Sequence, residues 1–500
     1  MILDLNNSYR SKISKENTKS KAILILLLNI VISIIIFYVA WQDVSKINYD
    51  KMLLIANLIY IWIFISWYKV FNSCINSYLI FVACTYMFYF GQHFLYVIGI
   101  PLDRGRTIAN TYSVQQYNTV AFFILLCMLL IHIGAFIATI TTRNLNTQLS
   151  YEINDSINKK IEIKALKIVS IFLLVISYLP TVIIRSNYIK IILSSGYGSV
   201  FLSDYYELGG FSNIPGFMST FIIPALIMAI LAFKDSKSFK FISFLAIVYI
   251  LLYFLSGSRY DAVLFIVTLI LAKKYYFGGL NRKSLFKIGV GGVLLITMIS
   301  LVSSIRSELS KTSNYLSLVS DILINLYENN ILFSFIKEMG FTMVATATVF
   351  VYCPSSIQYV YGETYFASFL RLFPNLFWDA HPAANVSVDS VFKSFLTSSG
   401  GIGSSFIAEA YYNFGYSSLL LMPIIGIALF KLFNKMEIAS KSDDRAKGFL
   451  TLYIFCFTLF FVRTDTVAFW RNLAYYGIFP YVMFYIVKKS ITSKLKFRKE

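Results

Sequence analysis

Twelve long apolar runs constrain this chain more than any other feature of its sequence. A bilayer core about 30 Å thick requires roughly 20 predominantly apolar residues to be crossed by a helix, and each run approaches that length without long charged interruptions. With 57% hydrophobic and 14% charged residues, the composition is that of a membrane protein and not of a soluble domain. We therefore predict an all-α fold, a polytopic membrane helix bundle with about twelve transmembrane helices.

The predicted spans lie near residues 22–41, 52–68, 77–98, 117–140, 166–184, 215–233, 240–256, 261–277, 286–304, 404–430, 448–462 and 470–487. We interpret the first run as a retained helix, because it follows a charged head and lacks the small-residue cleavage pattern of a signal peptide. The predicted organisation is nine spans with short loops in 1–304, one large outer loop in 305–403, and three spans with a basic tail in 404–500.

Basic residues predict the orientation. If both termini are cytoplasmic, the seven predicted inner segments hold 30 of the 44 lysines and arginines. Such an excess is the positive-inside rule, and the inner charges are suited to anionic lipid headgroups. The net charge of +19 therefore does not require a nucleic acid, for which the chain offers no basic-aromatic module.

The predicted outer face is rich in arginine, with eight arginines and six lysines, whereas the inner face has five arginines and 25 lysines. Arginine presents a planar fork of donors that matches phosphate and carboxylate oxygens. This bias favours recognition of an anionic group. The alternative is that these arginines pair with outer acids or extend to lipid headgroups.

The large loop contains an apolar run at 341–353 that is too short to span a bilayer, so we expect an amphipathic or re-entrant helix at the outer interface. Further along, Phe373, Phe377 and Trp378 suit either membrane-interface packing or stacking on sugars.

Three stretches place ionisable groups at the predicted membrane edge, where their cost usually indicates a wet cavity or a bundle interior. Two tight turns, "SGSRYD" at 256–261 and "FVRTDTVAFWR" at 461–471, carry arginine and aspartate. The third, at 400–430, opens with "GGIGSS", and its helical spacing puts Glu409, Tyr412 and Asn413 on one face. Glu409 would be paired with an outer arginine, poised as a base, or both.

Cysteines and histidines give no sign of a metal or cofactor. The five cysteines form no CxxC, and the three histidines are far apart in sequence. We predict neither a metal site nor a cofactor.

Together, the "GSR" turn, the late outer loop and the "EAYYNFG" helix resemble the O-antigen polymerase (Wzy) family. The architecture covers most of the chain, and the local motifs cover about 40 residues. The resemblance implies a glycosyltransferase in the bacterial inner membrane. It would join oligosaccharide repeat units carried on undecaprenyl pyrophosphate at the outer face, for O-antigen, capsule or exopolysaccharide. A chain-length regulator and a flippase are the implied protein partners. Only Arg259 and 409–415 carry over from the family.

The residue chemistry agrees with that implication. Arginines can stabilise a departing pyrophosphate, and a base must lie near the acceptor hydroxyl; Glu409 ranks first among the candidates. The candidate catalytic residues are Glu409, Arg259, Arg463, Asp465 and His381. The candidate pyrophosphate- or glycan-binding residues are Arg306, Arg371, Arg471, Arg104, Arg106, Tyr260, Tyr412 and Asn413.

Other functions stay open. An O-antigen ligase shares the large late loop but uses a different acceptor. A second class of lipid-phosphate glycosyltransferase places its acids in the first outer loop, where this chain has Asp43 and Asp50. A flippase or transporter is disfavoured because the chain shows no obvious half-to-half similarity. Nucleotide-sugar chemistry is disfavoured because the chain has no DxD and no Walker A loop.

Overall fold

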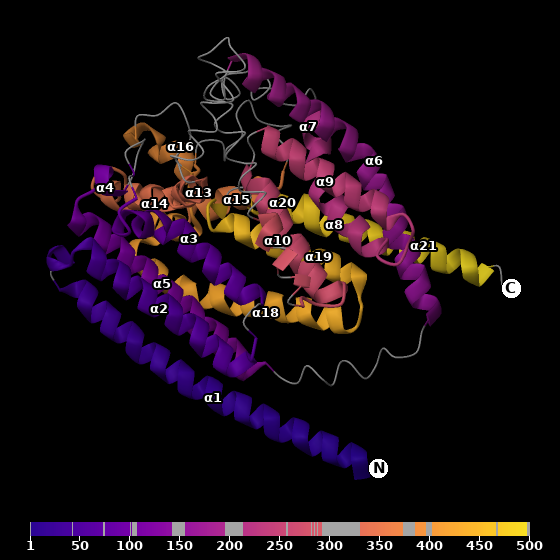
Figure 1. The fold of residues 1–500 in the computed structure, drawn as a ribbon, viewed down its shortest axis with the longest axis horizontal. Helices are drawn as coiled ribbons and strands as arrows, with labels where there is room; N and C mark the ends of the chain where they lie inside the picture. The colour runs from indigo at the N-terminus through magenta and orange to yellow at the C-terminus, as the bar shows by residue number, and fades with distance from the viewer. Residues whose placement is uncertain are drawn as a thin grey trace.

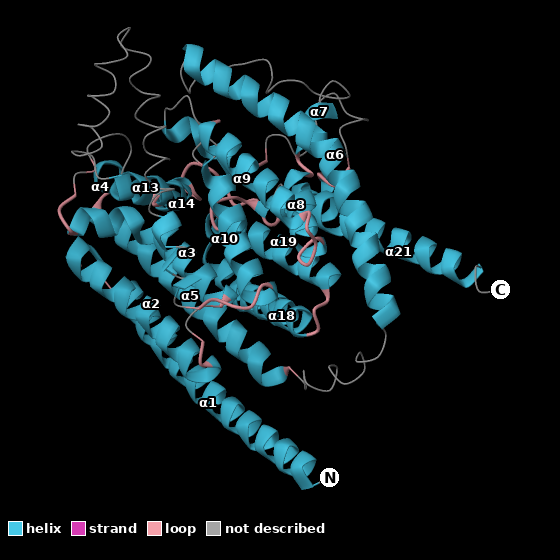
Figure 2. Cartoon of the chain, turned by 45° about the vertical axis from the view of Figure 1, so that its right-hand side comes forward, coloured by secondary structure: helices cyan, strands magenta, loops and turns pink. Residues whose placement is uncertain are grey.

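The computed structural model contains helices and no β-strand among the residues that it describes (Figures 1 and 2). Described are residues 2–42, 44–73, 76–100, 102, 108–142, 156–195, 214–256, 259–281, 283–284, 286–287, 289–292, 331–373, 386–396, 403–466 and 469–497. Among them, seven helical segments are long and apolar enough to cross a membrane: Lys19–Trp41, Tyr49–Phe71, Ser77–Val97, Val114–Thr141, Asn158–Ile192, Ile214–Ala232 and Phe406–Lys441. The predicted all-α, polytopic fold is therefore confirmed.

The first half of the chain contributes α1 (Ile2–Trp41), α2 (Tyr49–Phe71), α3 (Ser77–Val97), α4 (Ile108–Thr111), α5 (Val114–Thr141), α6 (Ser156–Ser195), α7 (Ile214–Ser219), α8 (Ile222–Ala232), α9 (Phe239–Leu255) and α10 (Arg259–Tyr276). The second half contributes α13 (Ile331–Met339), α14 (Phe341–Tyr352), α15 (Glu363–Leu370), α16 (Val388–Phe392), α17 (Phe406–Phe414), α18 (Met422–Lys441), α19 (Arg445–Phe461), α20 (Phe469–Asn472) and α21 (Phe479–Phe497). A 3₁₀ segment, Gly415–Leu421, joins α17 to α18, and a π-helix, Leu473–Ile478, joins α20 to α21.

Polar caps explain where several of the apolar helices begin. The side chain of Asn48 accepts a hydrogen bond from the backbone of Lys51 at the start of α2, and Asn76 caps α3 in the same way. Ser113 and Gln116 form a reciprocal capping box at the start of α5. Such caps satisfy backbone N–H groups that the first turn of a helix leaves without partners.

The bundle is organised around α5, which is buried along most of its length, whereas α1 is largely exposed. Two glycines let α5 and α18 cross with their backbones in contact. A Cβ atom on Gly134 would lie 2.0 Å from the carbonyl oxygen of Pro423, and one on Gly426 would lie 2.0 Å from that of Ile131. Small residues at crossings are a common way to pack helices tightly in membranes.

The run at 341–353 forms α14, which inserts into the bundle. Gly340 packs on the backbone of Gln92 in α3, and the ring of Phe350 lies 4.7 Å from Phe123 in α5 and 3.5 Å from Tyr411 in α17. With 12 residues, α14 is about 18 Å long and cannot cross a bilayer. Most of its residues are buried among other parts of the described chain, so α14 is not a helix on the surface of the molecule.

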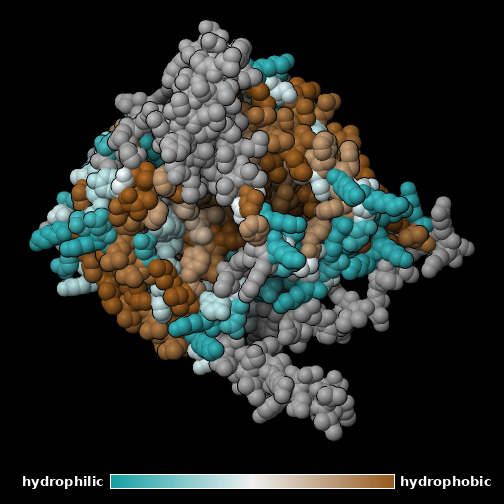
Figure 3. All heavy atoms as spheres, viewed as in Figure 1, coloured by the Kyte–Doolittle hydropathy of each residue, from teal (hydrophilic) through white to brown (hydrophobic). Residues whose placement is uncertain are grey.

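Apolar and polar residues are separated on the face that Figure 3 shows. Apolar residues cover much of it, while hydrophilic residues gather at its left edge and to the right of its centre. The first residues of α1 and the end of α21 both lie away from α4, α14 and α16 (Figure 1). We call the end formed by α13–α17 the site end, and the end at the α18–α19 turn the opposite end.

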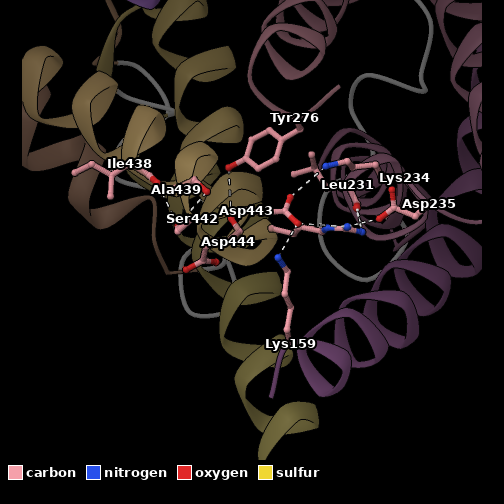
Figure 4. Close-up of polar contacts among 11 residues, drawn as sticks. Lys159, Leu231, Lys234, Asp235, Tyr276, Ile438, Ala439, Ser442, Asp443 and Asp444 are labelled. Carbon is pink, nitrogen blue, oxygen red and sulfur yellow. Dashed lines mark hydrogen bonds and ion pairs between the residues drawn. The ribbon is translucent and has the colours of Figure 1, made fainter. Parts of the chain in front are cut away.

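A cluster of ion pairs joins three parts of the chain at the opposite end (Figure 4). Asp443 lies in the α18–α19 turn and accepts from Lys159 of α6 at 3.0 Å and from Lys234, beyond α8, at 3.2 Å. Arg445 is buried and bonds the carbonyl oxygen of Leu231 at 3.2 Å and the carboxylate of Asp235. Burial would raise the pKa of Asp443, but the cations Lys159, Arg445 and Lys234 together hold it below its usual value.

Candidate functional site

The turn after α19 is the centre of the candidate site. It carries Arg463 and Asp465, and its backbone is fixed to the beginning of α17. The N–H of Ser404 donates to the carbonyl oxygen of Arg463 at 3.3 Å, and the N–H of Thr466 donates to Oε2 of Glu409 at 2.6 Å. The two segments are therefore held together by one backbone–backbone bond and by one bond from backbone to side chain, between residues 57 positions apart.

Glu409 is fully buried and accepts three hydrogen bonds. The hydroxyl groups of Thr364 and Thr466 donate to Oε1 at 2.7 and 2.5 Å, in addition to the backbone bond from Thr466 to Oε2. One turn later, Asn413 donates to Oγ1 of Thr364 at 2.7 Å and accepts from the N–H of Gly362 at 2.9 Å. This Glu409 network joins α15, α17 and the turn after α19.

The partners of Glu409 differ from those that the sequence suggested. Within the described part of the chain, its hydrogen-bond donors are two threonine hydroxyls and one backbone N–H, and no arginine is among them. Because both carboxylate oxygens already accept, the geometry favours a role for Glu409 in positioning the surrounding segments.

Asp465 lies on the other side of the same turn and is partly exposed. Its Oδ2 accepts from the N–H of Val388 at 3.1 Å, which fixes the first residue of α16. Asp389 of α16 in turn accepts from the N–H of Gly403 at 2.8 Å. Gly403 has φ +74°, a left-handed conformation that glycine adopts without steric cost.

Arg371 ends α15 beside this turn. Burial lowers the pKa of its guanidinium group, the positive charge of Arg471 acts in the same direction, and the carboxylate of Asp465 opposes both. The hydroxyl group of Tyr475, in the π-helix, donates to the carbonyl oxygen of Leu372 at 2.7 Å. The end of α15 is thus held against the segment that carries Arg471.

A second group of charges lies near Arg463. Asp261, in the first turn of α10, has Arg185 of α6 and Arg463 as its cationic neighbours. The guanidinium carbon of Arg185 lies 3.8 Å from the centre of the Tyr253 ring, and its Nη1 donates to Ser256 at 3.5 Å. Asp261 therefore brings a further carboxylate, and Arg185 with it, into the neighbourhood of the turn after α19.

Several predicted site residues come together here: Glu409, Asn413, Arg463, Asp465, Arg371 and Arg471. Tyr412 does not join Glu409, because its ring is buried against Phe392 at 5.1 Å. The remaining predictions cannot be placed. The side chains of Arg259 and Tyr260, at the start of α10, and residues Arg104, Arg106, Arg306 and His381 lie outside what the structure describes.

Sequence reasoning missed Thr364, Ser368 and Thr466 as members of the site. The hydroxyl group of Ser368 donates to Oγ1 of Thr466 at 3.0 Å, which extends the Glu409 network along α15. Thr466 lies in the "VRTDT" turn that the charges had singled out. Nothing in the sequence distinguishes Thr364 from other threonines in apolar surroundings.

The fold and this site define a multi-pass membrane protein with arginines and carboxylates gathered at one end of a helix bundle. A family model, O-antigen polysaccharide polymerase Wzy, matches residues 22–495, and the chain belongs to that family, whose members are glycosyltransferase-like polymerases. The predicted resemblance is thereby confirmed. No curated protein and no solved structure matches the chain.

Proposed function

We propose that this polymerase joins oligosaccharide repeat units carried on undecaprenyl pyrophosphate, at the outer face of the bacterial inner membrane. The observation that carries this proposal is the turn after α19, which gathers Arg463, Arg371, Arg471 and two carboxylates at one end of the bundle. The excess of lysine and arginine in the loops of the other end supports an outer position for the site.

In the proposed reaction, a sugar hydroxyl of the incoming repeat unit attacks the anomeric carbon of the growing glycan. The bond from that carbon to the pyrophosphate oxygen breaks, and undecaprenyl pyrophosphate leaves with the bonding electrons. Arg463, Arg371 and Arg471 stabilise the negative charge that develops on the leaving group, because guanidinium groups match phosphate oxygens. This step requires no further co-reactant.

The proton of the attacking hydroxyl requires a base, and the structure favours Asp465 over Glu409. Asp465 is partly exposed and close to Arg371, whereas both oxygens of the buried Glu409 accept internal hydrogen bonds. A base must reach the proton that it removes. Asp465→Asn is therefore expected to remove polymer while the protein keeps its thermal stability; normal polymer in this variant would refute the assignment.

The function is tested by deleting the gene and analysing the glycans on the carrier lipid. A polymerase defect leaves a single repeat unit on the outer leaflet. A flippase defect would trap it on the inner leaflet, and a ligase defect would leave complete polymer on the carrier. Restoration of polymer by the wild-type chain is the expected result, and its failure would refute the proposed function.

The arginine argument is tested by Arg463→Ala and Arg463→Lys. We expect both variants to be inserted in the membrane and to make no polymer, since lysine keeps the charge but not the planar fork. Arg259 lies in the family-like "GSR" turn, and Arg259→Ala is expected to behave in the same way. Lys51→Ala is the matched control, because it removes an exposed positive charge at the start of α2. Unchanged chain lengths in the arginine variants would contradict the proposal.

A further inference from the structure

Arg185 joins the long helix α6 to the end of α9. Its guanidinium carbon lies 3.8 Å from the centre of the Tyr253 ring, and its Nη1 donates to the hydroxyl group of Ser256 at 3.5 Å. Tyr253 and Ser256 are both buried. A guanidinium group above an aromatic face is attracted by the electrons of the ring, and this attraction is larger where water is excluded. Arg185 is therefore held against two buried residues of a neighbouring helix.

Ser256 is the residue at which α9 ends. Its N–H donates to the carbonyl oxygen of Leu252 at 2.9 Å, and its hydroxyl group donates to that of Tyr253 at 3.2 Å. A serine hydroxyl that donates one hydrogen bond can also accept another, so the bond from Arg185 is compatible with both. The helix α10 begins three residues later, at Arg259. Arg185 thus contacts the residue from which the chain enters the "GSR" turn.

Two buried rings extend this contact to α10, on the other side of the turn. The ring centre of Tyr249 lies 4.3 Å from that of Tyr253 and 5.0 Å from that of Phe265 in α10. Aromatic rings at such separations attract one another in addition to the gain from burial. The helix α9 accordingly lies between α6 and α10 (Figure 2). Arg185 is therefore connected to both helices that flank the turn, to α9 directly and to α10 through Tyr253 and Tyr249.

A second hydrogen bond between α6 and α9 lies away from the turn. The hydroxyl group of Tyr178 donates to the carbonyl oxygen of Leu245 at 3.1 Å. Leu245 lies in the middle of α9, and Tyr178 lies about two helical turns before Arg185. Both bonds hold α6 against α9, but that of Arg185 is the one at the turn. The two bonds therefore allow general helix packing to be compared with control of the turn.

We propose that Arg185 is a positioning residue, which fixes the α9–α10 turn and thereby the first residues of α10. The inference rests on the proposed function, in which Arg259 and Arg463 are needed for polymer. Asp261 is one of these first residues and has Arg463 among its cationic neighbours, so a shift of the turn would reach the site. Groups misplaced by about 1 Å can slow a reaction roughly 100-fold. Arg185 acts through the two residues that it contacts in α9, and not on the substrate.

The rate of polymer formation tests the proposal, with the full-length protein in vesicles of phosphatidylethanolamine and phosphatidylglycerol. The substrate is the lipid-linked repeat unit extracted from the deletion strain, and the rate is expressed per folded molecule. For Arg185→Gln we expect the maximal rate to fall at least about tenfold. The substrate concentration that gives half of the maximal rate should change less than about twofold. Arg185→Lys should recover much of the rate, because an ammonium group also binds an aromatic face.

Tyr178→Phe is the matched control, because it removes the other hydrogen bond between the two helices and keeps the ring. This variant should keep the full rate. A loss of rate as large as that of Arg185→Gln would show that general packing of α6 on α9 sets the rate, and would overturn the proposal. Wild-type protein that makes no polymer from this substrate would instead refute the proposed function, so the two failures are distinguishable.

Substitutions of Tyr253 separate positioning from direct contact with the substrate. Tyr253→Phe keeps the ring and should keep most of the rate, whereas Tyr253→Leu should slow the reaction about as much as Arg185→Gln. Because both changes break the same contact, the double variant Arg185→Gln/Tyr253→Leu should be no slower than the slower single variant. Two effects that multiply, or a higher half-maximal substrate concentration at an unchanged maximal rate, would mean that Arg185 binds the substrate itself. Either result would remove the positioning role.

Discussion

Carboxylates at the two ends of the bundle are held in different ways. At the opposite end, Asp443 is surrounded by Lys159, Lys234 and Arg445 in ion pairs of 3.0 to 3.6 Å. At the site end, Glu409 accepts from neutral threonine hydroxyls and a backbone N–H. The first arrangement neutralises charge locally, whereas the hydrogen-bond donors to Glu409 in the described chain are all neutral.

This difference indicates what each end does. The ion-pair cluster joins α6, the α8–α9 turn and the α18–α19 turn and holds these parts of the bundle together. Removing one buried partner from such a cluster is costly. At the site end, Glu409 and Asp465 lie close enough to interact electrostatically. In the proposed reaction, the arginines of the site end would attract the anionic leaving group.

The largest effect is expected for Glu409→Ala. The change leaves three buried donors without an acceptor, and each costs about 1–3 kcal/mol. We expect the thermal midpoint of the protein in detergent to fall further than in any other variant discussed, and polymer to disappear. Thr466→Val supplies the control for coupling: the double variant should lose less stability than the two single variants added together. Strict additivity would contradict the network.

Disrupting the ion-pair cluster at the opposite end is expected to lower the stability of the protein and to leave polymer synthesis unchanged. Arg445→Met removes a buried guanidinium group that bonds Leu231 and Asp235. Loss of one partner of a buried ion pair costs roughly 3–5 kcal/mol. Because Asp235 is exposed, we expect a cost near the smaller of these two values. Polymer made per folded molecule should equal that of the wild type. A selective loss of polymer would show that the two ends are functionally linked.

Much of the fold could be predicted because hydropathy follows directly from burial in lipid. Eight of the predicted spans each coincide with a single helix, and 286–304 falls largely outside the described residues. The spans at 215–233, 404–430 and 470–487 are each divided between two α-helices. The position of the run at 341–353 relative to the other helices could not be predicted from the sequence. Its length excludes a span, but insertion against Gln92 and Phe123 depends on tertiary packing.

The candidate site was predictable only in part. Charged groups at the membrane edge pointed to Arg463, Asp465 and Glu409, because such groups are costly there and rarely occur without a function. The partner of Glu409 was not predictable, since Thr364 lies 45 residues earlier and has no charge. Helical spacing also grouped Tyr412 with Glu409, although its ring packs against Phe392 instead.

The pH dependence of stability tests the ion-pair cluster around Asp443. Because the pKa of Asp443 is lowered by its cations, its ionised form stabilises the folded state at pH values above the ordinary aspartate pKa of about 3.9. That stabilisation is lost as the pH falls through the lowered pKa. We expect Asp443→Asn to be less stable than the wild type by about 1 kcal/mol at neutral pH. The difference should begin to shrink below about pH 4 and vanish once the pH is below the lowered pKa of Asp443. A difference that grows on acidification would have the wrong sign.

The smallest effect is expected for Glu437→Gln, which removes an ion pair near the same end. Lys441 lies 3.0 Å from Glu437 one turn away, and both side chains are more than half exposed. Pairs of this kind contribute about 0.3–0.5 kcal/mol and are screened by salt. Thermal unfolding with and without added salt should therefore show a small difference in low salt and none in high salt. A loss of stability as large as that expected for Arg445→Met would mean that burial does not determine which charges stabilise this end. The contrast between the two ends would then rest on the site end alone.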